Sequence, residues 1–440
     1  MLKFYSVGGY SHVGRNMTIV QYNDEFVILD MGLDLEQYIR FTQDEPFNKV
    51  NTKDLIRVGA LPNIEPFNAF KGKVLAIVPS HAHLDHIGAI PFIARKFKNA
   101  KILCTRFTGA VLKGLYKNEK HILKNDIVIL KNNSSYRVSN NFKIDLINVT
   151  HSVPDSSLIA VTTPDGTIVY SNDFKFDPDP LIGKPTDMEK LSKFKGAKLL
   201  VLDSLYATHK GKCPSEKEAE FLLRELLTQR SFINKAMFVT TFSSHISRLN
   251  SIVKLARKLN RKVVFLGRSL SNYSKAAIDS NLVKFADVRF FSGFRSIKEE
   301  LAMIERNGPS NYLVVTTGHQ GEPNAVLSKI LDQKLFTFRE HDAVVFSSST
   351  IPQPVNIENK NKLLSKLHDL NLDVFDDVHV SGHAFNDDHV EMIKTVRPEI
   401  LVPSHCEPHK IDAMRNIANG FDFIKNTKGL KEGDSFVLVK

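Results

Sequence analysis

Ser80-His81-Ala82-His83-Leu84-Asp85-His86 is the stretch that decides the fold of this 440-residue chain. It follows an apolar run at 74–78, which predicts a strand, and Pro79, which ends that strand. Four His or Asp side chains fall within six residues, and only a loop at a strand end can aim them all at one point. Imidazole and carboxylate without a nearby Cys favour an open catalytic site for zinc or a similar ion. The alternative, a polar loop with chance histidines, fits this density of ligands poorly.

Three more potential ligands follow strand-like runs. His151 follows the run 142–149, Asp173 follows 167–170, and His405 follows 400–402. Each alone could be a turn or capping residue, but with the loop they complete two tetrahedral sets. One divalent ion would take His81, His83 and His151, the other would take Asp85, His86 and His405, and Asp173 would bridge them. Two ions about 3.5–4 Å apart can hold a hydroxide between them and clamp a phosphoryl group.

Further motifs are spread nearly from end to end. They are Val7-Gly8-Gly9, Gly14-Arg15-Asn16-Met17, Leu29-Asp30-Met31-Gly32-Leu33, Leu202-Asp203-Ser204, Thr316-Thr317-Gly318-His319-Gln320-Gly321-Glu322-Pro323, Val345-Phe346-Ser347-Ser348, His379-Val380-Ser381-Gly382-His383 and Pro403-Ser404-His405. On these residues the chain resembles the metallo-β-lactamase-fold nucleases of the β-CASP group, and within it the short archaeal form of the ribonuclease J family. The loop at 80–86 marks only the superfamily, whereas the blocks at 316–323 and 379–383 are more specific.

The resemblance implies an α/β protein: a metallo-β-lactamase αββα sandwich with an inserted β-CASP domain, a Rossmann-like parallel sheet. We expect the hydrolase domain at 1–205 and 376–440 and the insert at 206–375, with the active site in the cleft between them. Within the insert, strand-like runs alternate with helical patterns, the rhythm of a doubly wound sheet. The chain stops soon after the last metal motif. We therefore expect no C-terminal domain of the bacterial kind and no RNA-binding extension before Met1, so that contacts with RNA and a homodimer would both use the core.

The resemblance also implies roles for individual residues. His383 matches the family histidine that protonates the leaving group, and Asp203 matches the acidic residue that holds it; we count Asp85 with them as catalytic. The two metal ions per chain are expected to be zinc, with manganese as an alternative. A pocket for the 5′-terminal phosphate is expected at small polar loops, formed by Ser243, Ser244, His245, Arg268, Ser269, His379 and Ser381.

The composition limits the classes of protein to consider. Hydrophobic residues make up 42% of the chain, enough for a substantial core, and the length predicts two domains. No apolar run is long enough to span a membrane, and the polar, Gly-rich first residues argue against a signal peptide. Three scattered cysteines argue against a disulfide framework and favour a reducing, cytoplasmic location.

The charge of the chain suits a polyanionic partner, which we expect to be RNA. Lys and Arg number 59 against 48 Asp and Glu, a net charge of +11. Residues 226–278 contain ten Lys or Arg and no acid. Within them, 246–259 predicts an amphipathic helix with Lys254, Arg257 and Lys258 on its polar face and Arg261 just beyond. A solvated helix face is the alternative, but so long an acid-free stretch favours a surface that faces phosphates.

The leading hypothesis is a metal-dependent 5′–3′ exoribonuclease that acts on single-stranded RNA with a 5′-monophosphate, in RNA processing and decay. A β-CASP endoribonuclease or a DNA-directed nuclease is the alternative among enzymes. A metal-free RNA-binding scaffold is the alternative outside them, and the intact ligand set argues against it. A hydrolase of small esters would have no use for a basic insert.

Overall fold

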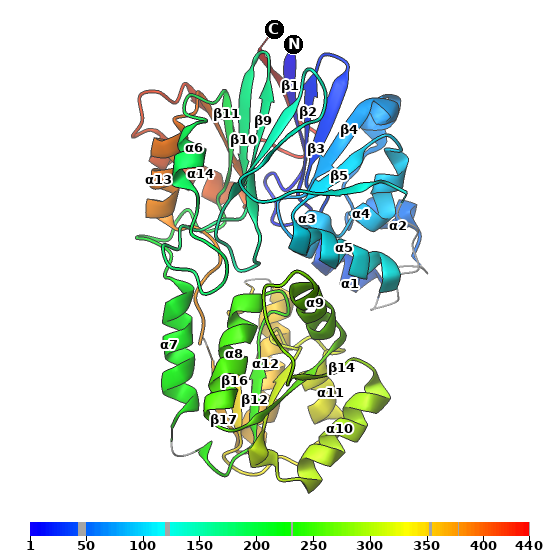
Figure 1. Ribbon diagram of the computed structural model, residues 1–440, viewed down its shortest axis with the longest axis vertical. Coiled ribbons are helices and arrows are strands. Elements are labelled where there is room, and N and C mark those ends of the chain that lie inside the picture. The colour runs from blue at the N-terminus through cyan, green and yellow to red at the C-terminus, as the bar shows by residue number, and fades with distance from the viewer. Residues whose placement is uncertain (43–49, 119–123, 230–231, 352–353, 377, 440) are drawn as a thin grey trace. The chain divides into compact units, whose positions relative to one another are not determined.

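The computed structural model describes residues 1–42, 50–118, 124–229, 232–351, 354–376 and 378–439 (Figure 1). Contacts divide the chain into two compact units. The first, here the sandwich unit, comprises Met1–Pro178, Gly183–Cys213 and Gly382–Lys440; the second, the parallel-sheet unit, comprises Asp179–Ile182 and Pro214–Ser381. These boundaries fall a few residues beyond the sequence-derived ones, because the loop before Cys213 hydrogen-bonds to the segment after His383: Asn386 N donates to the His209 carbonyl over 2.9 Å.

The sandwich unit contains two mixed seven-stranded sheets, drawn in the upper part of Figure 1. The first has the order β20-β1-β2-β3-β4-β5-β6 and the second has the order β19-β18-β11-β10-β9-β8-β7. The strands of the first sheet are β1 (Leu2–Gly8), β2 (Met17–Tyr22), β3 (Glu25–Leu29), β4 (Val74–Val78), β5 (Lys101–Cys104), β6 (Ile127–Ile129) and β20 (Ser435–Val439). Those of the second are β7 (Ser135–Arg137), β8 (Lys143–Asn148), β9 (Ser157–Thr163), β10 (Gly166–Ser171), β11 (Leu199–Asp203), β18 (Ile400–Ser404) and β19 (Asn426–Thr427).

The main core of this unit lies between the two sheets. Val27 and Leu29 of the first sheet and Ile159 and Val201 of the second belong to one buried apolar cluster. A second cluster lies on the other face of the second sheet, where Leu200 packs with residues of α6, α13 and α14. The helices of the unit are α1 (Leu35–Thr42), α2 (Thr52–Arg57), α3 (Leu84–Ile87), α4 (Ile90–Ile93), α5 (Arg106–Asn118), α6 (Met188–Ser192), α13 (Asn386–Val396) and α14 (Pro408–Ala418). The predicted αββα sandwich is therefore confirmed.

The parallel-sheet unit contains one six-stranded sheet in the order β14-β13-β15-β12-β16-β17, and every pair in it is parallel. Its strands are β12 (Met237–Thr240), β13 (Lys262–Leu266), β14 (Arg289–Phe291), β15 (Tyr312–Thr316), β16 (Ala343–Phe346) and β17 (Asp373–Phe375). Its helices are α7 (Glu216–Leu227), α8 (Ile246–Lys258), α9 (Arg268–Asp279), α10 (Phe294–Arg306), α11 (Val326–Asp332) and α12 (Pro354–Asp369). Central strands such as β12 and β15 are buried along their whole length, as their continuous apolar sequences predict.

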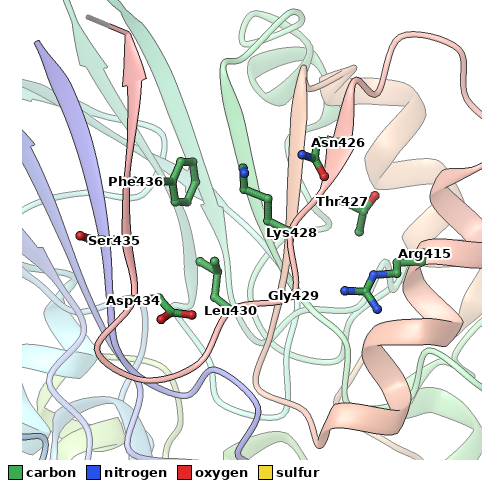
Figure 2. A pocket seen from close by; sticks show the side chains of 9 residues that line it. All are labelled: Arg415, Asn426, Thr427, Lys428, Gly429, Leu430, Asp434, Ser435 and Phe436. Carbon is green, nitrogen blue, oxygen red and sulfur yellow. The ribbon is translucent and has the colours of Figure 1, made fainter.

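A shallow pocket lies where β19 and β20 end the two sheets of the sandwich (Figure 2). Lys428 reaches over the ring of Phe436 there, with 5.0 Å between its Nζ and the ring centroid. The pocket lining contains no predicted metal or catalytic residue. In the part of the chain that the structure describes, no helix is both long and apolar enough to cross a membrane.

Candidate metal centre

The predicted ligands come together at the carboxyl ends of strands from both sheets of the sandwich. β4 leads into the loop with His81 and His83, and α3 then carries Asp85 and His86. The remaining three ligands follow β8, β10 and β18. The structure brings these side chains into three groups, with all ligand atoms of a group within 4.8 Å of one another. Two of the groups contain the predicted ligand sets, and the third includes His383, for which a role as a ligand was not predicted. The groups are His81, His83, His151 and Asp173; Asp85, His86 and His405; and Asp173, His383 and His405.

In the first group, three imidazole nitrogens converge on one region. The Nδ1 atom of His83 lies 3.0 Å from Nε2 of His81 and 3.2 Å from Nε2 of His151. Asp173 Oδ2 lies 3.5 Å from Nε2 of both His81 and His151. Three nitrogens and one carboxylate oxygen at such spacings form the kind of ligand set that a divalent ion of the zinc type uses.

The second group shares Asp173 with the first. His86 Nε2 lies 3.4 Å from Asp85 Oδ2 and 3.3 Å from Asp173 Oδ2. His405 Nδ1 lies 3.8 Å from Asp85 Oδ2 and 3.9 Å from Asp173 Oδ1. Asp173 thus faces both groups, the position that the sequence analysis assigned to it.

Hydrogen bonds to the outer nitrogens of His81, His86 and His151 orient these ligands. His151 Nδ1 donates to the Gly382 carbonyl over 2.7 Å, and His86 Nδ1 donates to Asp30 Oδ2 over 2.8 Å. His81 Nδ1 lies 3.0 Å from the Ser80 hydroxyl, which in turn donates to Asp30. Such partners fix the imidazole tautomer and turn the inner nitrogen toward the ligand group.

Glycine at 382 permits one of these contacts. A Cβ atom at Gly382 would lie 2.8 Å from Cβ of Ser152, closer than side-chain atoms approach. The backbone can therefore come close enough for its carbonyl to accept the His151 hydrogen bond.

The electrostatics of the groups keep most imidazoles neutral and the carboxylates ionised. Burial lowers the pKa of His83 to about 4 and holds the pKa values of His81 and His151 well below their usual range. Burial opposes ionisation of Asp173 and Asp85, but neighbouring imidazoles outweigh it and lower both carboxyl pKa values. Neutral imidazole and ionised carboxylate are the forms that bind a metal ion.

His86 differs from the other histidines of the site. Burial lowers its pKa, but the carboxylates of Asp173, Asp85 and Asp30 outweigh burial and raise the pKa well above its usual range. Three carboxylates therefore concentrate negative charge around one fully buried imidazole. Such an environment favours a cation.

Asn16 and Asp30 were quoted as parts of motifs, but the sequence analysis assigned them no role in the site. The Asn16 amide nitrogen lies 3.0 Å from His86 Nε2, 3.0 Å from His405 Nδ1 and 3.3 Å from Asp85 Oδ2. Asp30 is fully buried and accepts hydrogen bonds from Ser80, His86 and Tyr170. Asp30 also has a φ of 57°, a left-handed backbone conformation that its sequence does not predict.

One buried atom shows that this ligand set fits a metal ion. Oδ1 of Asp173 accepts no hydrogen bond from the described residues, although it is inaccessible to solvent. Leaving an ionised oxygen in such a position is costly unless a cation balances it. Together with the convergence of imidazole nitrogens, this orphaned oxygen makes the cluster fit divalent metal ions.

His383 and Asp203 form a pair beside these groups. His383 Nδ1 donates to Asp203 Oδ2 over 2.8 Å, and His383 Nε2 lies 3.9 Å from Asp173 Oδ2. Burial lowers the pKa of His383, but Asp203 and Asp173 outweigh it and raise that pKa to about 9. The two carboxylates thus favour the protonated imidazole, and Nε2 lies on the side of the ligand groups.

The predicted phosphate-binding residues lie in the parallel-sheet unit, in the loop after β12, at the start of α9 and in the segment before Gly382. Ser243 and Ser269 are joined by a hydrogen bond of 2.9 Å, and Arg268 beside them is exposed. Ser244 and His245 are buried, and His245 Nε2 lies 3.2 Å from Glu216 Oε2. His379 and Ser381 are half-buried. Arg268 and Ser269 are thus the exposed members of this set, and Ser243 is half-buried like His379 and Ser381.

The interpretation of the acid-free stretch is wrong for two of its arginines. Arg248 is fully buried, with its guanidinium bound to Glu216 and Ser347. Arg261 is also buried and donates to the carbonyls of Lys235 and Tyr312 over 2.9 and 3.1 Å. Neither side chain can face a phosphate, because the protein itself uses their hydrogen-bond donors.

The basic residues predicted on the polar face of α8 are exposed, but one of them is paired with an acid. Lys254, Arg257 and Lys258 are exposed, but Arg257 Nε donates to Asp287 over 2.8 Å. Asp287 lies outside the acid-free window, so sequence spacing alone did not reveal this pairing. Arg230, another member of the stretch, lies outside the described residues.

Comparisons with known proteins agree with this architecture. A family model for the beta-lactamase superfamily domain matches residues 47–232, and a model for the ribonuclease J beta-CASP domain matches 234–367. A model for the Zn-dependent metallo-hydrolase RNA specificity domain matches 368–423. The three matches follow one another along the chain, as expected for a β-CASP insert within a metallo-hydrolase.

Several curated proteins are similar over most of their length. Ribonuclease J of Methanocaldococcus jannaschii is 39% identical over 409 residues, covering 92% of this chain and 91% of that protein. Ribonuclease J of Pyrococcus abyssi is 36% identical, covering 92% and 90%. Among solved structures, a protein of unknown function from Enterococcus faecalis V583 aligns with a TM-score of 0.67 over 99% of both chains. At 17% identity, that likeness speaks for the fold alone.

Proposed function

This chain belongs to the ribonuclease J family, and we propose that it removes single nucleotides from the 5′-monophosphate end of single-stranded RNA. Membership makes it a ribonuclease, a hydrolase of phosphodiester bonds with RNA as substrate. The observation that carries the proposal is the position of Asp173, which faces both ligand groups and lies 3.9 Å from Nε2 of His383. Metal ligands and a protonated imidazole at such a distance can act on the two sides of one phosphoryl group.

The ligand set is proposed to hold two divalent ions, most simply zinc. His81, His83 and His151 would hold one ion, Asp85, His86 and His405 the other, and Asp173 would bridge them. When bound, two ions activate water for attack on phosphorus and offset the negative charge that develops there. Manganese remains an alternative, because imidazole and carboxylate accept both metals.

His383 is proposed to donate the proton that the leaving 3′-oxygen needs. Asp203 accepts the hydrogen bond from Nδ1–H, and Nε2 lies on the side of Asp173, 3.9 Å from its Oδ2. A carboxylate at this distance also keeps the imidazole protonated, the form that a general acid requires. Asp203 therefore acts through His383, as a positioning residue.

Accessible donors in the parallel-sheet unit are proposed to bind the terminal phosphate. The Ser243 and Ser269 hydroxyls are hydrogen-bonded to each other, and Arg268, which precedes Ser269 in the chain, is exposed. Ser244, His245, His379 and Ser381 complete the proposed set, with the two buried members supporting the loop. A pocket of this kind would accept a monophosphate and be overfilled by a triphosphate. A homodimer and a cytoplasmic location remain proposals.

The end preference can be tested with matched RNAs that carry a 5′-monophosphate, a 5′-hydroxyl or a 5′-triphosphate, together with a circular RNA. We expect mononucleotides as the product and the fastest reaction on the monophosphate, because a size-limited pocket selects that end. Product length and rate are read on denaturing gels with a label at either end. Equal rates on the three linear RNAs, or ready cutting of the circle, would instead identify an endonuclease.

RNA binding should depend strongly on salt, and the exposed face of α8 should contribute to it. Lys254 and Lys258 are exposed and form no ion pair with the described residues. Each phosphate contact changes the salt slope by about 0.7 on single strands, so Lys254→Glu with Lys258→Glu should flatten it by about 1.4. The double reversal Lys298→Glu with Lys334→Glu on other exposed lysines is the control. If the salt slope changes equally in both double variants, the RNA does not contact this face of α8.

A further inference from the structure

A cluster of aromatic side chains adjoins the His383–Asp203 pair and has no part in the function proposed so far. Tyr206, His209 and Phe385 pack mutually, with ring centroids 4.7 Å apart for Tyr206 and His209, 5.1 Å for His209 and Phe385, and 5.9 Å for Tyr206 and Phe385. We call these three residues the aromatic shelf. The Tyr206 ring also meets the His383 ring edge to face, with 6.0 Å between the centroids. The shelf thus contacts the proposed general acid, His383, through the ring of Tyr206.

The shelf is accessible. His209 is exposed, and Tyr206 and Phe385 are only half-buried. The Tyr206 hydroxyl has no hydrogen-bond partner among the described residues, and it is absent from the polar atoms that are sealed from solvent. Core aromatics with a polar group usually satisfy it internally. The partly exposed rings and the hydroxyl can therefore contact a ligand.

The two loops that carry the shelf are held together. Asn386 N donates to the His209 carbonyl over 2.9 Å, and Asp387 N donates to the Gly211 carbonyl over 3.0 Å. Asp388 caps the start of α13 by accepting from Phe385 N and also accepts from Cys213 N over 2.9 Å. A stacking surface held in this way loses little entropy when a ligand binds.

Charges of both signs lie around the shelf, with Asp387 and Asp388 just after Phe385 and two lysines on the paired loop. The segment 206–212 contains Lys210 and Lys212 and no acidic residue. Lys212 is bound to Glu391, but Lys210 is exposed and forms no ion pair with the described residues. Lys410 Nζ lies 6.0 Å from the centroid of the Tyr206 ring and is paired with Glu407 over 2.8 Å. Exposed aromatic faces interleaved with positive charge are the surface that single-stranded nucleic acids use.

We propose that the aromatic shelf stacks the base of the nucleotide on the leaving-group side of the scissile bond, which places that nucleotide's 3′-oxygen at His383. This rests on the proposed function, because the role of His383 fixes which nucleotide lies there. A general acid must contact the leaving oxygen, so the nucleoside that carries this oxygen lies on the His383 side. Through Tyr206, the shelf is an accessible aromatic surface in contact with the His383 ring. Stacking reads no base identity, which suits an enzyme that must accept every nucleotide in turn.

A fluorescent base tests the contact without catalysis. The probe is a 5′-monophosphorylated RNA with 2-aminopurine as its first base, bound to the full chain in the presence of a chelator. Stacking should quench the fluorescence, and Tyr206→Ala should remove at least half of the quench. Phe294→Ala, an exposed aromatic in the other unit, is the matched control. 2-Aminopurine at the fifth base should respond equally in all these proteins. Equal quenching of the first base by the parent, Tyr206→Ala and His209→Ala would overturn the proposal.

Kinetics separate stacking from damage to the fold. Tyr206→Ala should raise KM by about 5- to 20-fold with little change in kcat, the lower part of the range for loss of one stacking ring, and Tyr206→Phe should restore it. RNA with an abasic first nucleotide should give the parent and Tyr206→Ala the same KM, whereas a misfolded variant would stay impaired. His209→Ala, at an exposed position, should raise KM in the same direction, with His341→Ala as its control. A persisting KM difference on abasic RNA would refute the shelf.

The same measurements distinguish failure of the shelf from failure of the proposed function. If the parent protein quenches the first base but hydrolyses no RNA, the stacking role of the shelf is supported and the proposed activity is refuted. If the parent protein degrades RNA from the 5′ end while the first base stays unquenched, the stacking role of the shelf is refuted and the proposed activity is supported.

Discussion

Asp85→Ala combined with His86→Ala should reduce RNA hydrolysis to the background rate and leave the fold intact. Asp85 and His86 are two of the three residues in the second ligand group, and Asp85 Oδ2 lies 3.4 Å from His86 Nε2. Losing them should leave His405 without a ligand set, so that no second ion is held beside Asp173. Catalysis that depends on paired ions then loses both activation of water and neutralisation of charge.

The fold should survive, because the buried partner of His86 keeps other donors. Asp30 still accepts hydrogen bonds from Ser80 and from the Tyr170 hydroxyl, so its carboxylate is not left unpaired. Metal content by mass spectrometry and the melting temperature are measured with the rate. His341→Ala with Asp373→Ala removes another His–Asp pair, 3.0 Å apart, and serves as the matched control. Full turnover in the double variant would end the two-ion proposal.

The ligands were predictable because each follows a strand, and local sequence specifies where a strand ends. An apolar run such as 74–78 with a Pro behind it predicts both the element and the loop, and side chains at the carboxyl ends of strands share one rim. The partners that orient the ligands were not predictable in this way. Asp30 meets His86 across 56 residues, and Gly382 meets His151 across 231. Spacing along a chain says nothing about contacts that only sheet packing creates.

Charge was the feature that the sequence predicted least well. The stretch 226–278 lacks acids, but Glu216 and Asp287, on either side of it, reach back to pair with Arg248 and Arg257. Arg261 stabilises backbone carbonyls instead. A window of sequence counts charges, whereas the electrostatic potential at a surface depends on partners that enter from outside the window. On the polar face of α8, Lys254 and Lys258 remain candidates for the predicted contact with phosphates.

The aromatic shelf shows a different limit of prediction from sequence. Tyr206 and His209 follow Asp203, and Phe385 follows His383, so both halves adjoin residues that the motifs singled out. Neither half has a recognisable stacking pattern by itself. Only the pairing of the two loops, through hydrogen bonds such as that from Asn386 to His209, joins them into one surface.

Replacing His383 by Ala should slow hydrolysis by about 10²–10⁴-fold, the usual contribution of a general acid, without loss of bound metal. The structure also allows His383 to be a ligand, since it falls within one group with Asp173 and His405. Metal content decides between the roles: stoichiometry that falls as far as the rate would make His383 a ligand. His409→Ala, an exposed histidine of the same unit, is the control.

The pH profile of a second variant tests the role of His383 from the other direction. Asp203 helps to raise the pKa of His383 to about 9, so the acid form is lost only as the pH rises through that range. Asp203→Asn keeps the shape of the side chain but removes its charge, which lowers the pKa of His383. The alkaline limb of the rate should therefore move to lower pH, whereas a purely structural role for Asp203 would lower the rate equally at every pH. A limb that stays in place in Asp203→Asn would mean that His383 is not the group that delivers the proton.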